Sequence, residues 1–128
     1  MESKAEARYI RTSPQKARLV VDMIRGKRAD EAINILRATN KRLGSQGKPT
    51  PGVVEKVLRS AISNCESRFT NVDVDELRVT EAYVNEGPRM KRIRPAPMGR
   101  AFRYQRRMSH IVVKVGDGKP DEKAEEKE

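Results

Sequence analysis

Hydrophobic positions along the chain follow two patterns, the 3.6-residue spacing of helices and the alternation of strands. The first helical segment begins at Ser13 and Pro14 and ends near Gly26. Ser13 is expected to cap free amide groups, Pro14 suits a first helical position, and Gly26 suits a left-handed terminator. The apolar stripe of this helix consists of Ala17, Val20, Val21 and Ile24.

Two further helices are predicted by the same spacing. The second runs from Ala29 to about Arg42, with Asp30 and Glu31 in a first turn where acidic groups complement the helix dipole. Its expected buried face is Ala29, Ala32, Ile33 and Leu36. Gly and Pro predict a loop over residues 43–52. The third helix is expected over residues 53–69, with a buried face of Val54, Val57, Leu58, Ala61 and Cys65.

Alternating segments predict strands over residues 6–12, 77–84 and 111–115. These strands supply the surface that the helices need to cover. Between the last two, the chain is expected to leave the sheet at about Gly87 and return at about Ser109. The two strands are therefore antiparallel and joined by an extended hairpin, residues 87–109. At ~3.3 Å per residue, arms of about seven residues project on the order of 20 Å.

The predicted hairpin concentrates positive charge. Residues 89–107 carry eight Lys or Arg side chains and no Asp or Glu. The chain of 128 residues has a net charge of +10, and its last thirteen residues contribute −3, so residues 1–115 carry +13. Such an excess favours a phosphate-rich partner, because a dense run of like charge repels itself. Residues 1–115 are expected to form one domain, and residues 116–128 a disordered acidic tail.

Both faces of the hairpin are expected to be basic. One face of the first arm carries Arg89, Lys91 and Ile93, and the other carries Met90, Arg92 and Arg94. Neither face suits packing on the protein's own core. Phe102 and Tyr104 share one face of the return arm, and two interpretations are open: they stack on unpaired bases, or they pack across the hairpin on Ile93.

The first helix and the preceding strand offer a second basic surface. Its residues are Arg8, Arg11, Lys16, Arg18, Arg25 and Lys27. Charge on the outer face of an amphipathic helix is ordinary, so an RNA contact and a merely solvated face are both open interpretations.

Catalytic and metal-binding chemistry finds little support. His110 is the single histidine, and in a strand it points to the face opposite Ser109, so the two form no nucleophile–base pair. His110 is expected to hydrogen-bond locally or to contact a phosphate. Cys65, the single cysteine, is expected to be a small buried hydrophobe. Residues 71–76 are expected to form a turn rather than a calcium loop. We therefore predict no enzyme, no cofactor and no metal.

Two features of the sequence indicate where in the cell the protein is located. The chain has no apolar run near the ~20 residues that a membrane span needs. Residues 1–6 lack the apolar stretch of a secretory signal. An intracellular setting is therefore expected.

Five segments resemble the large-subunit ribosomal protein twenty-two family of bacterial type. They are Ser13-Pro-Gln-Lys-Ala-Arg-Leu-Val-Val-Asp-Met-Ile-Arg-Gly-Lys27, Ala82-Tyr-Val-Asn-Glu-Gly-Pro88, Met90-Lys-Arg92, Gly99-Arg-Ala101 and Arg106-Arg-Met-Ser-His-Ile111. They occur in the family's order between about Arg8 and Val115. At the hairpin tip the chain departs from the usual Pro-Arg-Ala-x-Gly-Arg pattern, because Ala96 and Pro97 follow Pro95.

The resemblance implies an α+β fold with three helices packed on a three-stranded antiparallel sheet and a long protruding β-hairpin. It also implies a structural constituent of the large ribosomal subunit, in the cytoplasm, that binds large-subunit ribosomal RNA and supports subunit assembly. Its hairpin would line the nascent-peptide exit tunnel. The expected partners are that RNA, neighbouring large-subunit ribosomal proteins and the nascent polypeptide, with no homo-oligomer.

These expectations name specific residues. The tunnel-facing tip comprises Arg94, Pro95, Ala96, Pro97, Met98, Gly99 and Arg100. RNA-binding residues are Arg8, Arg11, Lys16, Arg18, Arg25, Lys27, Arg89, Lys91, Arg92, Arg94, Arg100, Arg103, Tyr104, Arg106, Arg107 and His110. The alternative function is a free nucleic-acid-binding regulator that uses the hairpin as a β-ribbon in a DNA groove, which would require a dimer. A small hydrolase lacks a triad.

Overall fold

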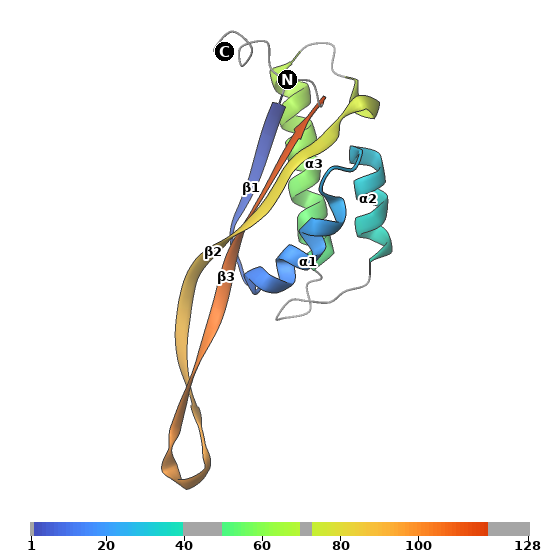
Figure 1. Cartoon of the computed structure of the whole chain (residues 1–128). Helices are drawn as coiled ribbons and strands as arrows, with labels where there is room; N and C mark the ends of the chain where they lie inside the picture. The colour runs from blue at the N-terminus through green and yellow to red at the C-terminus, as the bar shows by residue number, and fades with distance from the viewer. Residues whose placement is uncertain (1, 40–49, 70–72, 118–128) are drawn as a thin grey trace, which may run out of the picture.

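The computed structural model describes residues 2–39, 50–69 and 73–117. Three helices lie on one side of a sheet, and two of its strands extend far beyond the helices as a hairpin (Figure 1). The elements in chain order are β1 (Glu2–Ile10), α1 (Pro14–Ile24), α2 (Ala29–Ala38), α3 (Thr50–Arg68), the 3-10 helix η1 (Val74–Glu76), β2 (Arg78–Pro95), the 3-10 turn η2 (Pro97–Gly99) and β3 (Ala101–Gly116).

The sheet has the strand order β1-β3-β2, and both pairings are antiparallel. β3 is therefore the central strand, and its Val113 lies between Ala5 of β1 and Ala82 of β2. The predicted α+β fold, with three helices on a three-stranded antiparallel sheet and a protruding hairpin, is confirmed.

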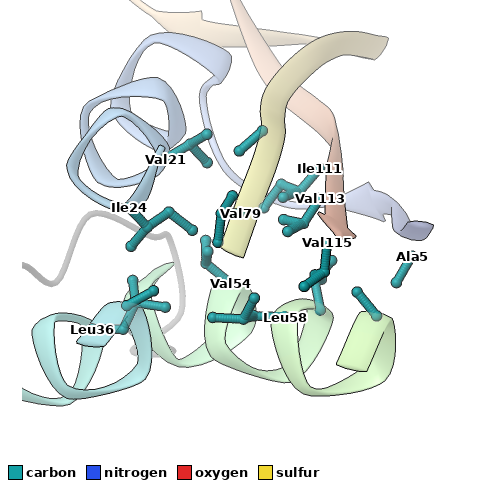
Figure 2. Close-up of a cluster of buried hydrophobic side chains, with 14 of the residues drawn as sticks. Ala5, Val21, Ile24, Leu36, Val54, Leu58, Val79, Ile111, Val113 and Val115 are labelled. Carbon is teal, nitrogen blue, oxygen red and sulfur yellow. The ribbon is translucent and has the colours of Figure 1, made fainter. Parts of the chain in front are cut away.

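The core forms where the helices meet the sheet (Figure 2). All four residues of the predicted α1 stripe are fully buried, as are Val54 and Leu58 of α3 and Val113 and Val115 of β3. The predicted faces of α2 and α3 are also buried, except that Ile33 is only partly covered. Cys65 is buried, as predicted.

The ends of α1 agree only in part with the sequence. Gly26 has a φ of 79°, so the predicted left-handed terminator is confirmed. Ser13 makes no side-chain capping hydrogen bond, so the predicted cap is wrong. Pro14 still begins the helix, because the N–H that proline lacks would have no intrahelical partner at that position.

The other two helices differ from prediction at their ends. α2 stops at Ala38 because Thr39 is already extended, and residues 40–42 lie outside the described part of the chain. The predicted loop over residues 43–52 is wrong for its last three residues, since α3 begins at Thr50 and includes Pro51 and Gly52. Proline is tolerated in a first turn for the reason that holds in α1. Residues 43–49 of that loop lie outside the description.

The first strand begins and ends earlier than predicted, at Glu2 and Ile10 rather than residues 6–12. Ser3 and Ala5 point to the core while charged residues alternate outward. The register with β3 shifts between Ala7 and Ile10, where Tyr9 has a φ of 59°. This irregularity ends the pairing and turns the chain towards α1.

Three further predictions concern the second half of the chain. Within residues 71–76, the described part is a turn in which the Asp73 carboxylate accepts from the Asp75 N–H at 3.0 Å, as expected. As predicted, β2 and β3 leave the three-stranded part of the sheet near Gly87 and Ser109, because the pairing of β1 with β3 ends at Ser109. The pairing of β2 with β3 continues to the tip, with one register shift between Glu86 and Arg89. The tail was predicted over residues 116–128, but Gly116 still belongs to β3, and residues 118–128 lie outside the description.

Candidate nucleic-acid interface

The hairpin beyond Gly87 is a two-stranded ribbon whose facing positions are dominated by cations. Arg89 lies opposite Arg107, and the pairing continues to Pro95 opposite Ala101. Like charges directly opposite each other destabilise a strand pair. At the root of the hairpin, Glu86 neutralises Arg89 with an ion pair of 3.3 Å. In the other pairs a cation faces an uncharged residue, up to Arg94 opposite Phe102. Because residues 89–107 contain no carboxylate, the positive charge of the ribbon is not balanced within it.

The register assigns each hairpin side chain to a face, since opposed residues share one. One face carries Arg89, Lys91, Ile93, Arg103, Gln105 and Arg107, and the other carries Met90, Arg92, Arg94, Phe102, Tyr104 and Arg106. Nearly all of these residues are exposed. Both faces are therefore basic and neither packs on the core.

The aromatic residues of the return arm lie on the face opposite Ile93, so the interpretation that they pack on Ile93 is wrong. The Arg94 guanidinium instead lies over the Tyr104 ring, 5.2 Å from its centroid. Such a cation–π contact holds a cation and a ring side by side. Phe102 is 61% exposed and Ile93 68% exposed.

The tip is a tight turn closed by one backbone hydrogen bond, from the Ala96 N–H to the Arg100 carbonyl at 2.8 Å. Met98 and Gly99 both have left-handed φ values, 64° and 70°. This conformation is uncommon for a residue other than glycine. It leaves the Met98 side chain 93% exposed at the far end of the hairpin.

Two of the predicted body cations hold the fold together. Arg25 donates to the Ala82 carbonyl at 2.8 and 3.1 Å and pairs with Asp22 at 2.8 Å. Arg18 donates to the Val84 carbonyl at 3.2 Å. These three hydrogen bonds attach α1 and the residue that caps its C-terminus to β2, which is an edge strand of the sheet. The sequence did not show this role, because only the folded structure shows that α1 lies against β2.

The remaining body residues lie on different surfaces. Arg8 pairs with Glu6 at 3.2 Å, and Lys27 is exposed after α1. His110 accepts from the backbone N–H of Tyr9 at 3.1 Å, so its hydrogen bond reaches the neighbouring strand rather than a local group. The Tyr9 ring meets the imidazole edge-on, with centroids 5.0 Å apart.

Arg11 and Lys16 lie beside the hairpin. They line an open groove of about 480 Å³ together with Arg94, Tyr104 and two further cations of β3, Arg106 and Arg107. Thr12, Ser13 and Gln105 complete the groove. These three were not predicted, because no local pattern marks a polar residue that only tertiary structure brings to a charged groove.

The chain matches the family described as Ribosomal protein L22p/L17e over residues 5–116, which covers all three helices and the whole hairpin. The chain belongs to this family. It is therefore a structural protein of the large ribosomal subunit and not an enzyme.

Individual relatives in this ribosomal family are similar along almost the full chain. The large ribosomal subunit protein uL22 of Solibacter usitatus (strain Ellin6076) is 70% identical over 115 residues, 90% of this chain and 96% of the relative. The protein of the same name from Staphylococcus haemolyticus (strain JCSC1435) is 51% identical over 123 residues, 96% of this chain and 98% of the relative. That of Staphylococcus aureus (strain Newman) gives the same identity and coverage.

The described part of this ribosomal protein has neither a cluster of metal ligands nor a helix that could cross a membrane. Within residues 2–39, 50–69 and 73–117, no three His, Cys, Asp or Glu residues gather as metal ligands. No helix in those ranges is long and apolar enough to cross a membrane. Ser109 is fully buried and points away from the partly exposed His110 face.

Proposed function

We propose that this ribosomal protein binds large-subunit ribosomal RNA, supports subunit assembly, and lines the nascent-peptide exit tunnel with its hairpin. The observation that carries the proposal is the hairpin itself. Its residues 89–107 hold eight cations and no carboxylate, and both faces are exposed and basic. Only a partner that surrounds the ribbon with negative charge satisfies both faces at once, and folded RNA is such a partner.

Most of the proposed RNA contacts neutralise phosphates rather than identify bases. Arg suits this task because its planar guanidinium pairs bidentately with phosphate and stacks on bases. On the hairpin the contacting residues are Arg89, Lys91, Arg92, Arg94, Arg100, Arg103, Tyr104, Arg106 and Arg107. On the body they are Arg8, Arg11, Lys16, Arg18, Arg25, Lys27 and His110. Residues 1–115 act as one domain in this binding.

The hairpin tip is the proposed tunnel wall. Its turn places Met98 at the end of the ribbon, 93% exposed between Pro97 and Gly99. An apolar side chain held outward contacts a passing polypeptide without a specific hydrogen bond. The other proposed partners are neighbouring large-subunit ribosomal proteins, and the proposed location is the cytoplasmic ribosome.

Sedimentation of native extract in Mg²⁺ buffer tests the proposal. The protein should move with large subunits, and trypsin should cut residues 89–107 in the isolated protein while sparing them on the subunit. A protein that stays at the top of the gradient would contradict the ribosomal RNA assignment and favour a free regulator. Equal protection without RNA would contradict a hairpin held by a polyanion.

The tunnel assignment has its own test. A photoreactive amino acid at Met98 should crosslink to a stalled nascent chain, and the same group at the exposed body position Glu66 should not. Equal crosslinking from both positions, or none from Met98, would remove the tip from the tunnel wall.

A further inference from the structure

The groove lies along the edge of β3 that faces the turn before α1, because β3 has a paired strand on only one side in the hairpin. β2 accompanies β3 to the tip, whereas the pairing of β1 ends with Ile10 opposite Ser109. Within the part of the chain that the structure describes, no strand pairs with β3 on that side beyond Ser109. The chain instead turns at Thr12, whose N–H donates to the Ile10 carbonyl at 2.8 Å, and enters α1.

Three separate segments supply the positive charge of this groove. Arg11 and Lys16 come from the turn and the start of α1, Arg94 from β2, and Arg106 and Arg107 from β3. No carboxylate belongs to the lining. Lys16, Arg94, Arg106 and Arg107 line the groove from α1 and from both faces of the ribbon, and like charges brought this close repel one another. An anion in the groove therefore stabilises the arrangement.

The shape and the polar lining specify the anion. The volume of about 480 Å³ lies within the roughly 300–1,000 Å³ of small-ligand sites, so a phosphate fits together with part of its nucleotide. Thr12, Ser13 and Gln105 offer hydrogen-bond donors beside the cations. The Ser13 hydroxyl is not used to cap α1, and the first N–H groups of any helix lack intrahelical partners.

We propose that this groove is a phosphate-binding site that takes a phosphodiester of the RNA backbone. This inference rests on the proposed RNA binding and names the part of the surface that grips the chain. Tyr104, held against Arg94 at the groove, offers a ring for the adjoining base. Because the ligand contacts α1, the turn and both arms, its binding fixes the hairpin against the body.

The first test uses the full chain, labelled with ¹⁵N, and inorganic phosphate as the probe. Phosphate should produce saturable shifts of the Thr12, Ser13 and Gln105 amides, and chloride or glutamate at the same ionic strength should not. The variant Lys16→Gln/Arg106→Gln should abolish the saturation. Lys4→Gln/Lys56→Gln removes the same charge from exposed body positions outside the groove and should retain it. Shifts equal in chloride, or equal in glutamate, would overturn the phosphate assignment.

The second test measures affinity for deproteinised large-subunit ribosomal RNA as a function of salt. In the groove variant, the slope of log K against log salt should fall by about 0.7 for each phosphate that the protein no longer neutralises, and the control variant should keep the wild-type slope. An unchanged slope in the groove variant, with tight wild-type binding, would overturn the groove while leaving the proposed function intact. Failure of the wild-type protein to bind this RNA would instead overturn the proposed function.

Discussion

Gly87 is the position at which the hairpin root is most sensitive to one added carbon. A Cβ at this residue would lie 3.0 Å from the carbonyl carbon and oxygen of Met108 and 3.1 Å from its Cβ. Carbon atoms pack comfortably at about 3.5–4.0 Å, so the two backbones must separate by roughly 0.5 Å. Overpacking of this kind costs about 1–3 kcal/mol. Gly87→Ala should therefore weaken strand pairing at the root by that amount.

Amide hydrogen exchange followed by NMR measures this effect. At about 1.4 kcal/mol for each factor of ten, protection of the β3 amides near Met108 should fall about five- to a hundredfold, while core amides such as Val113 change little. Gly99→Ala is the matched control: an added Cβ meets nothing within 4 Å, and its φ of 70° confines the strain to the tip. Unchanged protection near Met108 in Gly87→Ala would refute the steric reasoning.

Three further predictions concern stability. Leu58→Ala should lower the free energy of unfolding by about 2–5 kcal/mol in urea, because Leu58 is fully buried; a loss below about 1 kcal/mol would contradict its place in the core. Arg25→Ala should cost about 1–2 kcal/mol, because it removes the bonds to the Ala82 carbonyl, and a control Arg37→Ala, which loses only an exposed ion pair with Glu55, should cost less. Burial raises the pKa of the Cys65 thiol above 9.0, and a hydrogen bond to Glu81 raises the pKa of Lys114 above 10.5. Both groups bind protons more tightly when folded, so stability should fall as pH rises above about 9 through Cys65 and above about 10.5 through Lys114. Urea midpoints that stay level from pH 9 to 10.5, or that fall equally there in Cys65→Ala, would contradict the Cys65 contribution.

The helices and the central strand were predictable because burial repeats along them. The α1 stripe from Ala17 to Ile24 follows the helical period, and every member is buried. β1 was harder to delimit, since its inward residues Ser3 and Ala5 are small and the alternation there is one of charge rather than of hydrophobic size. The start of α3 was missed because Pro51 and Gly52 suggest a loop unless the first turn of a helix is considered.

The hairpin site was predictable as a charge pattern and not as a geometry. The sequence shows that both arms are basic, but the face opposite Ile93 and the stacking of Arg94 on Tyr104 depend on a register that only the pairing defines. The sequence could not show that Arg18 and Arg25 donate hydrogen bonds to backbone carbonyls of β2. An Arg in that structural role and an Arg that binds a phosphate look the same in a sequence. The groove required residues from three segments to be placed in space.

The position of β3 at the centre of the sheet governs the order in which this protein can fold during synthesis. Glu2 at the start of β1 pairs with Gly116 at the end of β3, and Arg78 at the start of β2 pairs with the same residue. Neither pairing can form until nearly the whole chain has emerged, and contacts so distant in sequence close slowly. Until then the apolar faces of three finished helices have no sheet to cover. A growing chain of this protein is therefore exposed to aggregation until its last strand arrives.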